Sequence, residues 1–314
     1  MEGIFNQISI AKETVYGTEA TPILSLPVNA SDGIQVNQEV IGHEAIKGTA
    51  PKNKAFFKGK QSYSGGYEMA IMPNSVGYIL LSALGAVVDS TVEAGAVYKH
   101  VYTEGSTRVG LTIEQKIDTI AKRFAGFVVS NIKISAKVGG LCLITFTGQA
   151  KGQADATPIT KTYETLAPLN WAEITTLSIG GTDIKAKVDS IEIEYDNGLE
   201  MFYGLGAITP ATKYIKQSTC KGKIEAYVDA TTDDYLASLI AGTEAELILT
   251  ITGTPTIGSA SHSILKVQVP KTAFTKVGTK LDFGYNAISL EFEGREDATN
   301  GLIVAELTNT TASY

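Results

Sequence analysis

The sequence contains little arginine, histidine, cysteine or tryptophan for its length. Its 314 residues include three arginines (Arg108, Arg123 and Arg295), three histidines, two cysteines and one tryptophan. Arginine binds phosphates through paired hydrogen bonds, so its scarcity, with a net charge of −7, argues against stable binding to nucleic acid or to an anionic membrane. No segment approaches the ~20 apolar residues of a membrane span. Residues 1–6 have neither a charged leader nor an apolar core, so we expect no signal peptide.

Signals of catalysis or metal binding are equally scarce. His43, His100 and His262 are isolated, with no two at the spacing of metal ligands, and we expect them on the surface or in loops. Cys142 and Cys220 form no pair suited to a zinc site, and we interpret both as reduced, buried apolar residues. The sequence lacks a nucleophile elbow, a Walker loop, a dinucleotide fingerprint and a calcium loop. We therefore expect no enzyme activity, no cofactor and no metal.

What the sequence does contain is an internal repeat. Residues 60–85 combine a strand pattern, a turn and a short helix pattern, and residues 217–242 repeat this order without a gap. The matched pairs include Gly65 with Gly222, Glu68 with Glu225, Tyr78 with Tyr235, and Gly85 with Gly242. Each pair is separated by 157 positions, half of the 314 residues, and the same offset places Ile34–Asn37 on Ile191–Glu194.

Each copy of the repeat predicts one short helix. In the first copy Asn74 is the expected N-cap, the buried stripe runs along one face, and Gly85 ends the helix. The stripe consists of Val76, Ile79, Leu80, Ala83 and Leu84. In the second copy we expect a helix over residues 231–241. Both span about three turns, too few to be stable alone, so each must pack on neighbouring strands.

Most of the remaining sequence alternates apolar and polar residues, as half-buried antiparallel strands do. Segments 108–116, 124–138 and 141–147 are examples. We expect a mainly β (α+β) protein made of two similar sandwich- or barrel-like domains in tandem, each with one short flanking helix. Residues 1–155 would form the first domain and residues 156–314 the second.

Two segments of the first domain do not follow this pattern. Residues 1–30 are polar and interrupted by glycine and proline, which favours an extended N-terminal arm. Residues 42–60 contain five lysines beside Phe56 and Phe57, and we expect a long loop, a kind that is commonly functional or disordered. Docking on a neighbouring subunit, nucleic-acid binding and a plain flexible loop are all compatible with this composition.

Acidic residues alternate along Ile191–Asp196. On a strand this spacing places Glu192 and Glu194 on one face. The simpler interpretation is that this face of the sheet is exposed to solvent. The more specific interpretation is that Glu192 and Glu194 belong to a negatively charged surface.

These segments together resemble the tail tube proteins of long-tailed bacteriophages. The likeness lies in residues 8–22 (Ile-x-Ile-Ala-Lys-Glu-Thr-x-Tyr-Gly-Thr-x-Ala-x-Pro), in Tyr63–Gly85, in Ile144–Gly148 and in Gly294–Asn309. The resemblance implies a β-sandwich with a flanking helix, whose inner sheet joins those of neighbours into a barrel around a channel. It also implies a long loop that reaches the next ring, and rings of six single-domain subunits.

A duplicated chain changes the number of chains that we expect in each ring. Three chains with two domains each supply six equivalent units, so we expect a homotrimeric, pseudo-hexameric ring, with a hexamer of chains as the alternative. Stacking rings head to tail repeats one contact without closing and produces a tube. The expected contact residues are Tyr16 in the arm and, in the loop, Lys47, Lys52, Lys54, Phe56, Phe57 and Lys58. Glu192 and Glu194 are expected to face the lumen.

The predicted function is therefore that of a structural virion protein. It would self-assemble in the host cytoplasm into the tail tube, a conduit through which DNA passes without specific binding. A tape-measure protein, a tail terminator and distal tail proteins are the other expected partners, and no membrane is involved. A minor or distal tail component, a receptor- or carbohydrate-binding β-sandwich and a hydrolase are the alternatives, the last weakened by the missing catalytic residues.

Overall fold

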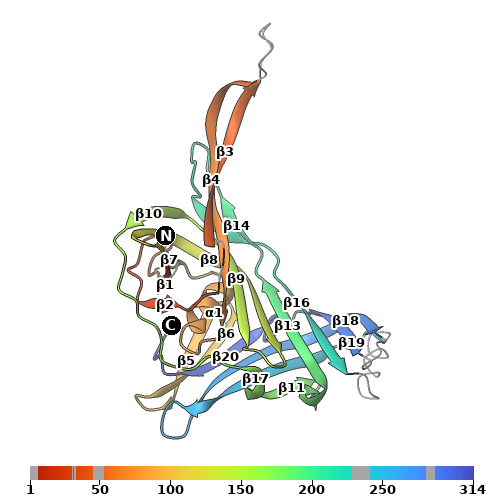
Figure 1. The fold of residues 1–314 in the computed structure, drawn as a ribbon. Coiled ribbons are helices and arrows are strands. Elements are labelled where there is room, and N and C mark those ends of the chain that lie inside the picture. Colours follow the sequence, from red (N-terminus) through yellow and green to blue (C-terminus); the bar gives the residue numbers. More distant parts are fainter. Residues whose placement is uncertain (1–5, 30, 32, 45–52, 228–240, 281–286) are drawn as a thin grey trace.

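The computed structural model describes residues 6–29, 31, 33–44, 53–227, 241–280 and 287–314. The predicted β-rich class is confirmed: every strand pairing among the described residues is antiparallel, and the α-helix α1 (Val76–Leu84) lies among the strands (Figure 1). The described residues also include the 3₁₀ turns η2 (Trp171–Glu173) and η3 (Lys185–Lys187). In the part of the chain that is described, no helix is long and apolar enough to cross a membrane.

The longest run of paired strands forms what we call the central sheet. Its order is β3 (Gly33–Glu44), β4 (Asn53–Ala70), β9 (Leu143–Ala150), β8 (Ile120–Lys137), β13 (Val188–Asp196), β16 (Thr219–Tyr227), β19 (Ala287–Gly294) and β18 (His262–Lys280). The first four strands come from the first half of the chain and the last four from the second half.

Two further sheets branch from the central sheet through β8 and β18. The first has the order β2 (Leu24–Leu26), β1 (Gln7–Lys12), β7 (Leu111–Ile117), β8 and β10 (Gly152–Ala156). The second has the order β12 (Thr182–Asp183), β11 (Ile174–Ile179), β17 (Ala245–Thr256), β18, β20 (Val304–Asn309), β6 (Val97–Glu104) and β5 (Gly85–Glu93). A separate hairpin consists of β14 (Leu199–Phe202) and β15 (Thr212–Ile215).

The two halves pair their strands in the same order. Each of β8 and β18 begins in a branch sheet and ends in the central sheet. In β8 the change occurs near Gly126, whose φ of 67° allows the bend and whose amide donates to the buried Glu13 carboxylate. The expected second helix falls almost entirely on residues 228–240, which lie outside the described residues.

Helix α1 is buried on nearly every side, so the predicted single buried stripe was too narrow. Only Tyr78 is half-buried, and the helix packs against β8, β5 and β6. Gly85 ends it in the left-handed conformation, as predicted. Asn74 is not its cap: Ser75 precedes the helix, and the half-buried Glu164 carboxylate accepts hydrogen bonds from the amides of Asn74 and Ser75 and from the Ser75 hydroxyl.

Part of the segment expected to be an extended N-terminal arm, Gln7–Lys12, is instead an interior strand, β1. β1 lies between β2 and β7, and both of its faces are buried. Ile8 and Ile10 enter the apolar core, while Gln7 and Ser9 form a buried hydrogen-bonded cluster with Ser25. Polar residues of this segment thus lie inside the protein and bond to one another, although the Gln7 Oε1 atom has no hydrogen-bond partner among the described residues.

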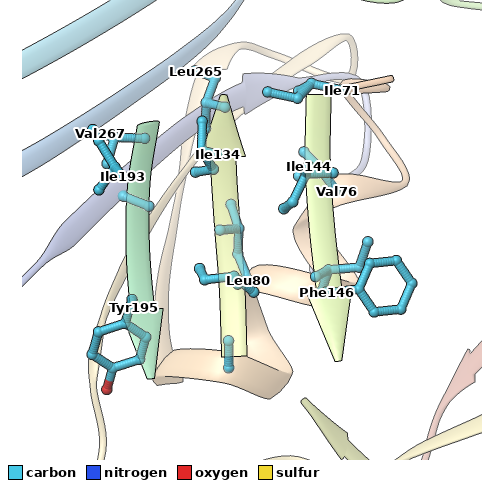
Figure 2. Close-up of a cluster of buried hydrophobic side chains, with 14 of the residues drawn as sticks. Ile71, Val76, Leu80, Ile134, Ile144, Phe146, Ile193, Tyr195, Leu265 and Val267 are labelled. Atoms are coloured by element: carbon cyan, nitrogen blue, oxygen red, sulfur yellow. The ribbon is translucent and has the colours of Figure 1, made fainter. Parts of the chain in front are cut away.

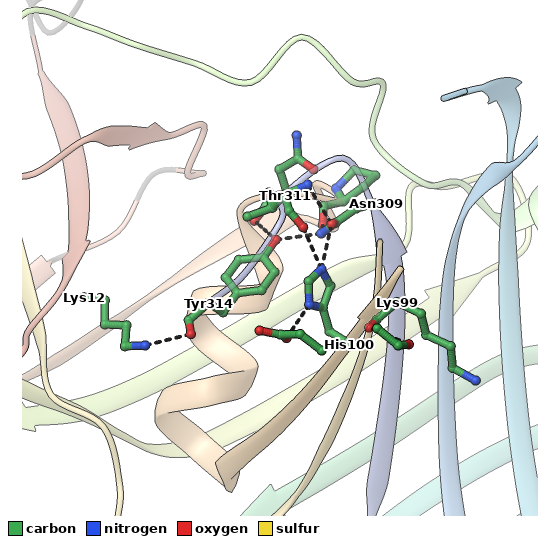
Figure 3. A network of polar contacts seen from close by, with 10 residues as sticks. Lys12, Lys99, His100, Asn309, Thr311 and Tyr314 are labelled. Atoms are coloured by element: carbon green, nitrogen blue, oxygen red, sulfur yellow. Dashed lines mark hydrogen bonds and ion pairs between the residues drawn. The ribbon is translucent and has the colours of Figure 1, made fainter. Parts of the chain in front are cut away.

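A polar network holds residues 309–314 against α1 (Figure 3). His100 is fully buried, contrary to the expectation of a surface position. Its Nδ1 lies 2.7 Å from Asp89, and its Nε2 lies 2.9 Å from the carbonyl oxygen of Thr311. The Tyr314 ring packs on the His100 ring, with centroids 4.7 Å apart, and its hydroxyl donates to the carbonyl oxygen of Asn74.

Candidate assembly surfaces

The central sheet has one apolar and one charged face. Figure 2 shows its apolar side, where Ile193 and Tyr195 of β13, Ile134 of β8, and Ile144 and Phe146 of β9 lie near α1 and near Leu265 and Val267 of β18. All five are buried. Because side chains alternate along each strand, the intervening residues lie on the opposite face.

On that opposite face, direct cross-strand partners carry opposite charges. One row is Glu293, Lys221, Glu194 and Lys133, on β19, β16, β13 and β8. The second row is Lys276, Glu291, Lys223 and Glu192, on β18, β19, β16 and β13. We call these two rows the charge ladder. Pairs of this kind each stabilise a sheet by roughly 0.2–1 kcal/mol.

Ion pairs link neighbouring members of the ladder. The Glu194 carboxylate lies 3.4 Å from Lys221, Glu192 lies 3.8 Å from Lys133, and Glu291 lies 2.9 Å from Lys276. The sequence interpretation of Glu192 and Glu194 as a negative wall was therefore wrong in one respect. They do share a face, but lysines from the two neighbouring strands, β8 and β16, compensate them. Those lysines were missed because only the strand register brings them there.

The lysine-rich segment is largely a β-hairpin, not the long loop predicted. β3 and β4 continue past the body of the protein as a two-stranded projection (Figure 1). Phe57 and Ile41 are direct partners on one face and are 59% and 52% exposed. Lys58 is exposed on the opposite face, beside Val40.

The other expected contact residues of this segment are only partly placed. Lys54 and Phe56 lie on β4, but their side chains are not among those described. Lys47 and Lys52 lie outside the described residues. An isolated two-stranded hairpin is marginally stable in water, and this hairpin exposes the apolar pair Ile41 and Phe57. Both features indicate a surface that contacts a partner.

Tyr16 is half-buried and contacts the β14–β15 hairpin. The Lys213 ammonium of β15 lies 4.0 Å from its ring centroid, and its hydroxyl contacts the Met201 sulfur of β14 at 3.5 Å. Burial, reinforced by the charge of Glu13, raises the pKa of Tyr16, and burial lowers the pKa of Lys213 to about 8. Tyr16 thus joins the N-terminal segment to the hairpin of the second half.

The ends of the central sheet are unpaired in the described residues. β3 pairs only with β4, and residues 276–280 of β18 pair only with β19. Unpaired strand edges offer free backbone donors and acceptors to another chain. The two edges therefore form candidate assembly surfaces together with the projecting hairpin.

No metal site is apparent where side chains are described, since no group of three or more His, Cys, Asp or Glu could hold an ion. Cys142 and Cys220 are buried and unpaired, as predicted, and burial raises the pKa of each thiol to about 12. Neither is therefore a reactive thiolate at neutral pH.

A family model described as "Phage tail tube protein" matches residues 6–300, which is nearly the whole chain. A search of curated proteins finds no match.

Proposed function

The chain belongs to the phage tail tube protein family, and from this premise we propose that three copies form each ring of a tail tube. Membership of this family makes the protein a structural component of the virion tail. The repeated strand order supports the trimer, because two equivalent domains per chain, residues 1–155 and 156–314, would supply six units per ring. Assembly in the host cytoplasm is part of the same proposal.

The observation that carries this proposal is the central sheet. It runs continuously from the first half of the chain to the second, has one charged face, and ends in two unpaired edges among the described residues. Three such sheets joined edge to edge would close into a barrel and leave no edge exposed. The charged face would line the channel, because the opposite face packs against the core.

The charge ladder suits a channel through which DNA slides. A protein that neutralises phosphates binds DNA tightly, and each lysine of the ladder is already beside a carboxylate. Glu192 and Glu194 would thus serve the channel by compensating Lys133 and Lys221, and not only by repelling phosphates.

The projecting hairpin is the proposed contact between stacked rings. Phe57 and Lys58, with Lys47, Lys52, Lys54 and Phe56 of the same lysine-rich segment, would dock on the neighbouring ring, with the aromatic residues as anchors. Tyr16 would contribute by holding the β14–β15 hairpin in place. A tape-measure protein inside the tube, a terminator at one end and distal tail proteins at the other are the expected partners of such a tube.

Electron microscopy of the concentrated protein, averaged down the ring axis, tests this function. We expect rings or tubes with a central hole and three chains per ring. Rings of six chains would keep the function and overturn the trimer. Particles that never assemble, even with a tape-measure partner, would favour the alternative of a receptor- or carbohydrate-binding β-sandwich. Low abundance in virions would favour a minor or distal tail component.

A further inference from the structure

The chain contains one junction between its own halves within the central sheet. β8 of the first half pairs with β13 of the second half, with Lys133 opposite Glu194 and Asn131 opposite Asp196. The Asn131 side chain also donates to the Glu194 carboxylate at 2.8 Å. This junction can serve as a template for the contact between neighbouring chains, because each of its two strands has a counterpart in the other half.

β3 is the counterpart of β13, and their registers can be matched at a glycine. Gly65 lies opposite Ile34, and Gly222 lies opposite Ile193. At both glycines an added Cβ would collide with a carbonyl oxygen of the neighbouring strand, that of Gly33 in one case and that of Glu192 in the other. Ile34 therefore corresponds to Ile193, two residues from the match to Ile191 that the sequence offset suggested.

β18 is the counterpart of β8, and their registers can be matched at a bulge. Opposite β9, the register of β8 shifts between Val129 and Asn131. Opposite β19, the register of β18 shifts between Phe274 and Lys276. Bulges are fixed features of a strand pair, so Asn131 corresponds to Lys276.

From these two matches we propose that β18 of one chain pairs antiparallel with β3 of the next chain and copies the β8·β13 junction. Asn37 then lies opposite Lys276, Val36 opposite Val277, and Gln35 opposite Gly278. The inference rests on the proposed ring and adds the strand pair and register that close it.

The side chains on the two edges fit this register. Val36 is 41% exposed and shares the apolar face with the half-buried Val277, so each covers the other. Asn37 and Lys276 lie on the charged face, where Asn37 would continue the second row of the charge ladder into the next chain. If the register were shifted by one residue, Val36, whose side chain lies on the apolar face, would lie opposite a residue whose side chain lies on the charged face. The two valines would then no longer cover each other.

Four positions on the charged face test the register: Gln35, Asn37, Lys276 and Gly278. The double variants Asn37→Cys/Lys276→Cys and Gln35→Cys/Gly278→Cys place thiols opposite each other. The shifted variants Asn37→Cys/Gly278→Cys and Gln35→Cys/Lys276→Cys use the same positions on diagonals of about 7–8 Å, beyond the Cα separation of most disulfides. Within one chain these positions lie at opposite edges of an eight-stranded sheet, far outside disulfide reach.

Oxidised assemblies are analysed on non-reducing gels, and unoxidised samples of the same variants are examined by electron microscopy. We expect covalent dimers and closed trimers from the matched pairs and at least tenfold less from the shifted pairs. Lys133→Cys/Glu194→Cys, the equivalent pair inside the chain, is the positive control and should give a disulfide within one chain.

The two proposals fail differently. Intact trimeric rings whose shifted pairs cross-link as well as the matched pairs, or in which no pair cross-links while the internal control does, would overturn the register and leave the tube function standing. If unsubstituted protein forms no rings, the proposed function is overturned, and this inference falls with it.

Discussion

Glu194 on β13 lies directly opposite Lys221 on β16, with 3.4 Å between carboxylate and ammonium, and directly opposite Lys133 on its other side. A glutamate between two lysines of different strands is part of a surface on which the two signs alternate. The face proposed to line the channel is therefore compensated locally, although the whole chain carries a net charge of −7.

Replacing Glu192 and Glu194 with lysine should turn this surface into one that binds DNA. Each new lysine would lie beside existing lysines of the ladder, at a cost of roughly 0.2–1 kcal/mol per like-charged pair, which a domain of this size tolerates. We expect tubes to form but to retain DNA, with affinity that falls steeply as salt rises. Salt titration of DNA binding by assembled tubes, and ejection from virions, would measure the effect.

The matched control reverses one pair and keeps the charges balanced. Glu194→Lys combined with Lys221→Glu leaves the net charge of the face unchanged, although each reversed residue then lies opposite one residue of like charge, Glu293 or Lys133, and it should release DNA as the unsubstituted protein does. Normal DNA release from tubes of the Glu192→Lys/Glu194→Lys variant would contradict the proposed position of this face in the channel.

Gly77 in α1 should not tolerate alanine, although alanine favours helices over glycine by about 1 kcal/mol. A Cβ at Gly77 would overlap the ring of Tyr314, which is buried against His100 and fixed by hydrogen bonds of its hydroxyl. We expect Gly77→Ala to lower the free energy of unfolding by about 1–3 kcal/mol, as overpacking does. Tyr314→Ala will itself be destabilising, but adding Gly77→Ala to it should cost little. Urea denaturation of the four proteins gives the coupling, and strictly additive effects would show that the ring is not the obstacle.

The sequence predicted the features that depend on local chemistry. Gly85 ends α1 because glycine adopts positive φ at low cost, and the alternation along residues 124–138 predicted a strand there. The buried cysteines also followed from their apolar character. In each case the decisive information lies within a few residues of the chain.

What was missed depends on distant partners. β1 could not be distinguished from an exposed arm because Ser25 and Glu114, which lie on other strands, complete its polar surroundings. His100 is buried because Asp89, Asn309 and Thr311 supply oxygen atoms from two separate segments. The lysines of the charge ladder likewise become partners of Glu192 and Glu194 only once the register is fixed.

Acid should weaken the contact between Glu93, at the end of β5, and residues 259–261, which connect β17 to β18. Hydrogen bonds from the Ser261 hydroxyl and from the amides of Ser259 and Ala260 lower the pKa of this exposed carboxyl from 4.5 to about 2. A lowered folded-state pKa means that the stabilisation is complete above pH 4.5 and is lost as the pH falls toward 2. The denaturation midpoints of the unsubstituted protein and of Glu93→Gln should therefore differ at neutral pH and converge below pH 3. Curves that stay parallel between the unsubstituted protein and Glu93→Gln over this range would contradict the assignment.

The exposed apolar pair on the projecting hairpin should control the stacking of rings and not their formation. Phe57→Asp and Ile41→Asp alter side chains that are more than half exposed, so the folded chain and its central sheet should be unaffected. Losing an anchor residue typically costs 1–2 kcal/mol or more, which corresponds to roughly a tenfold rise in the protein concentration needed for assembly. We expect single rings in electron micrographs where the unsubstituted protein gives tubes. Phe57→Leu keeps the apolar contact and should still give tubes, whereas tubes of ordinary length from Phe57→Asp would place the contact between rings elsewhere on the chain.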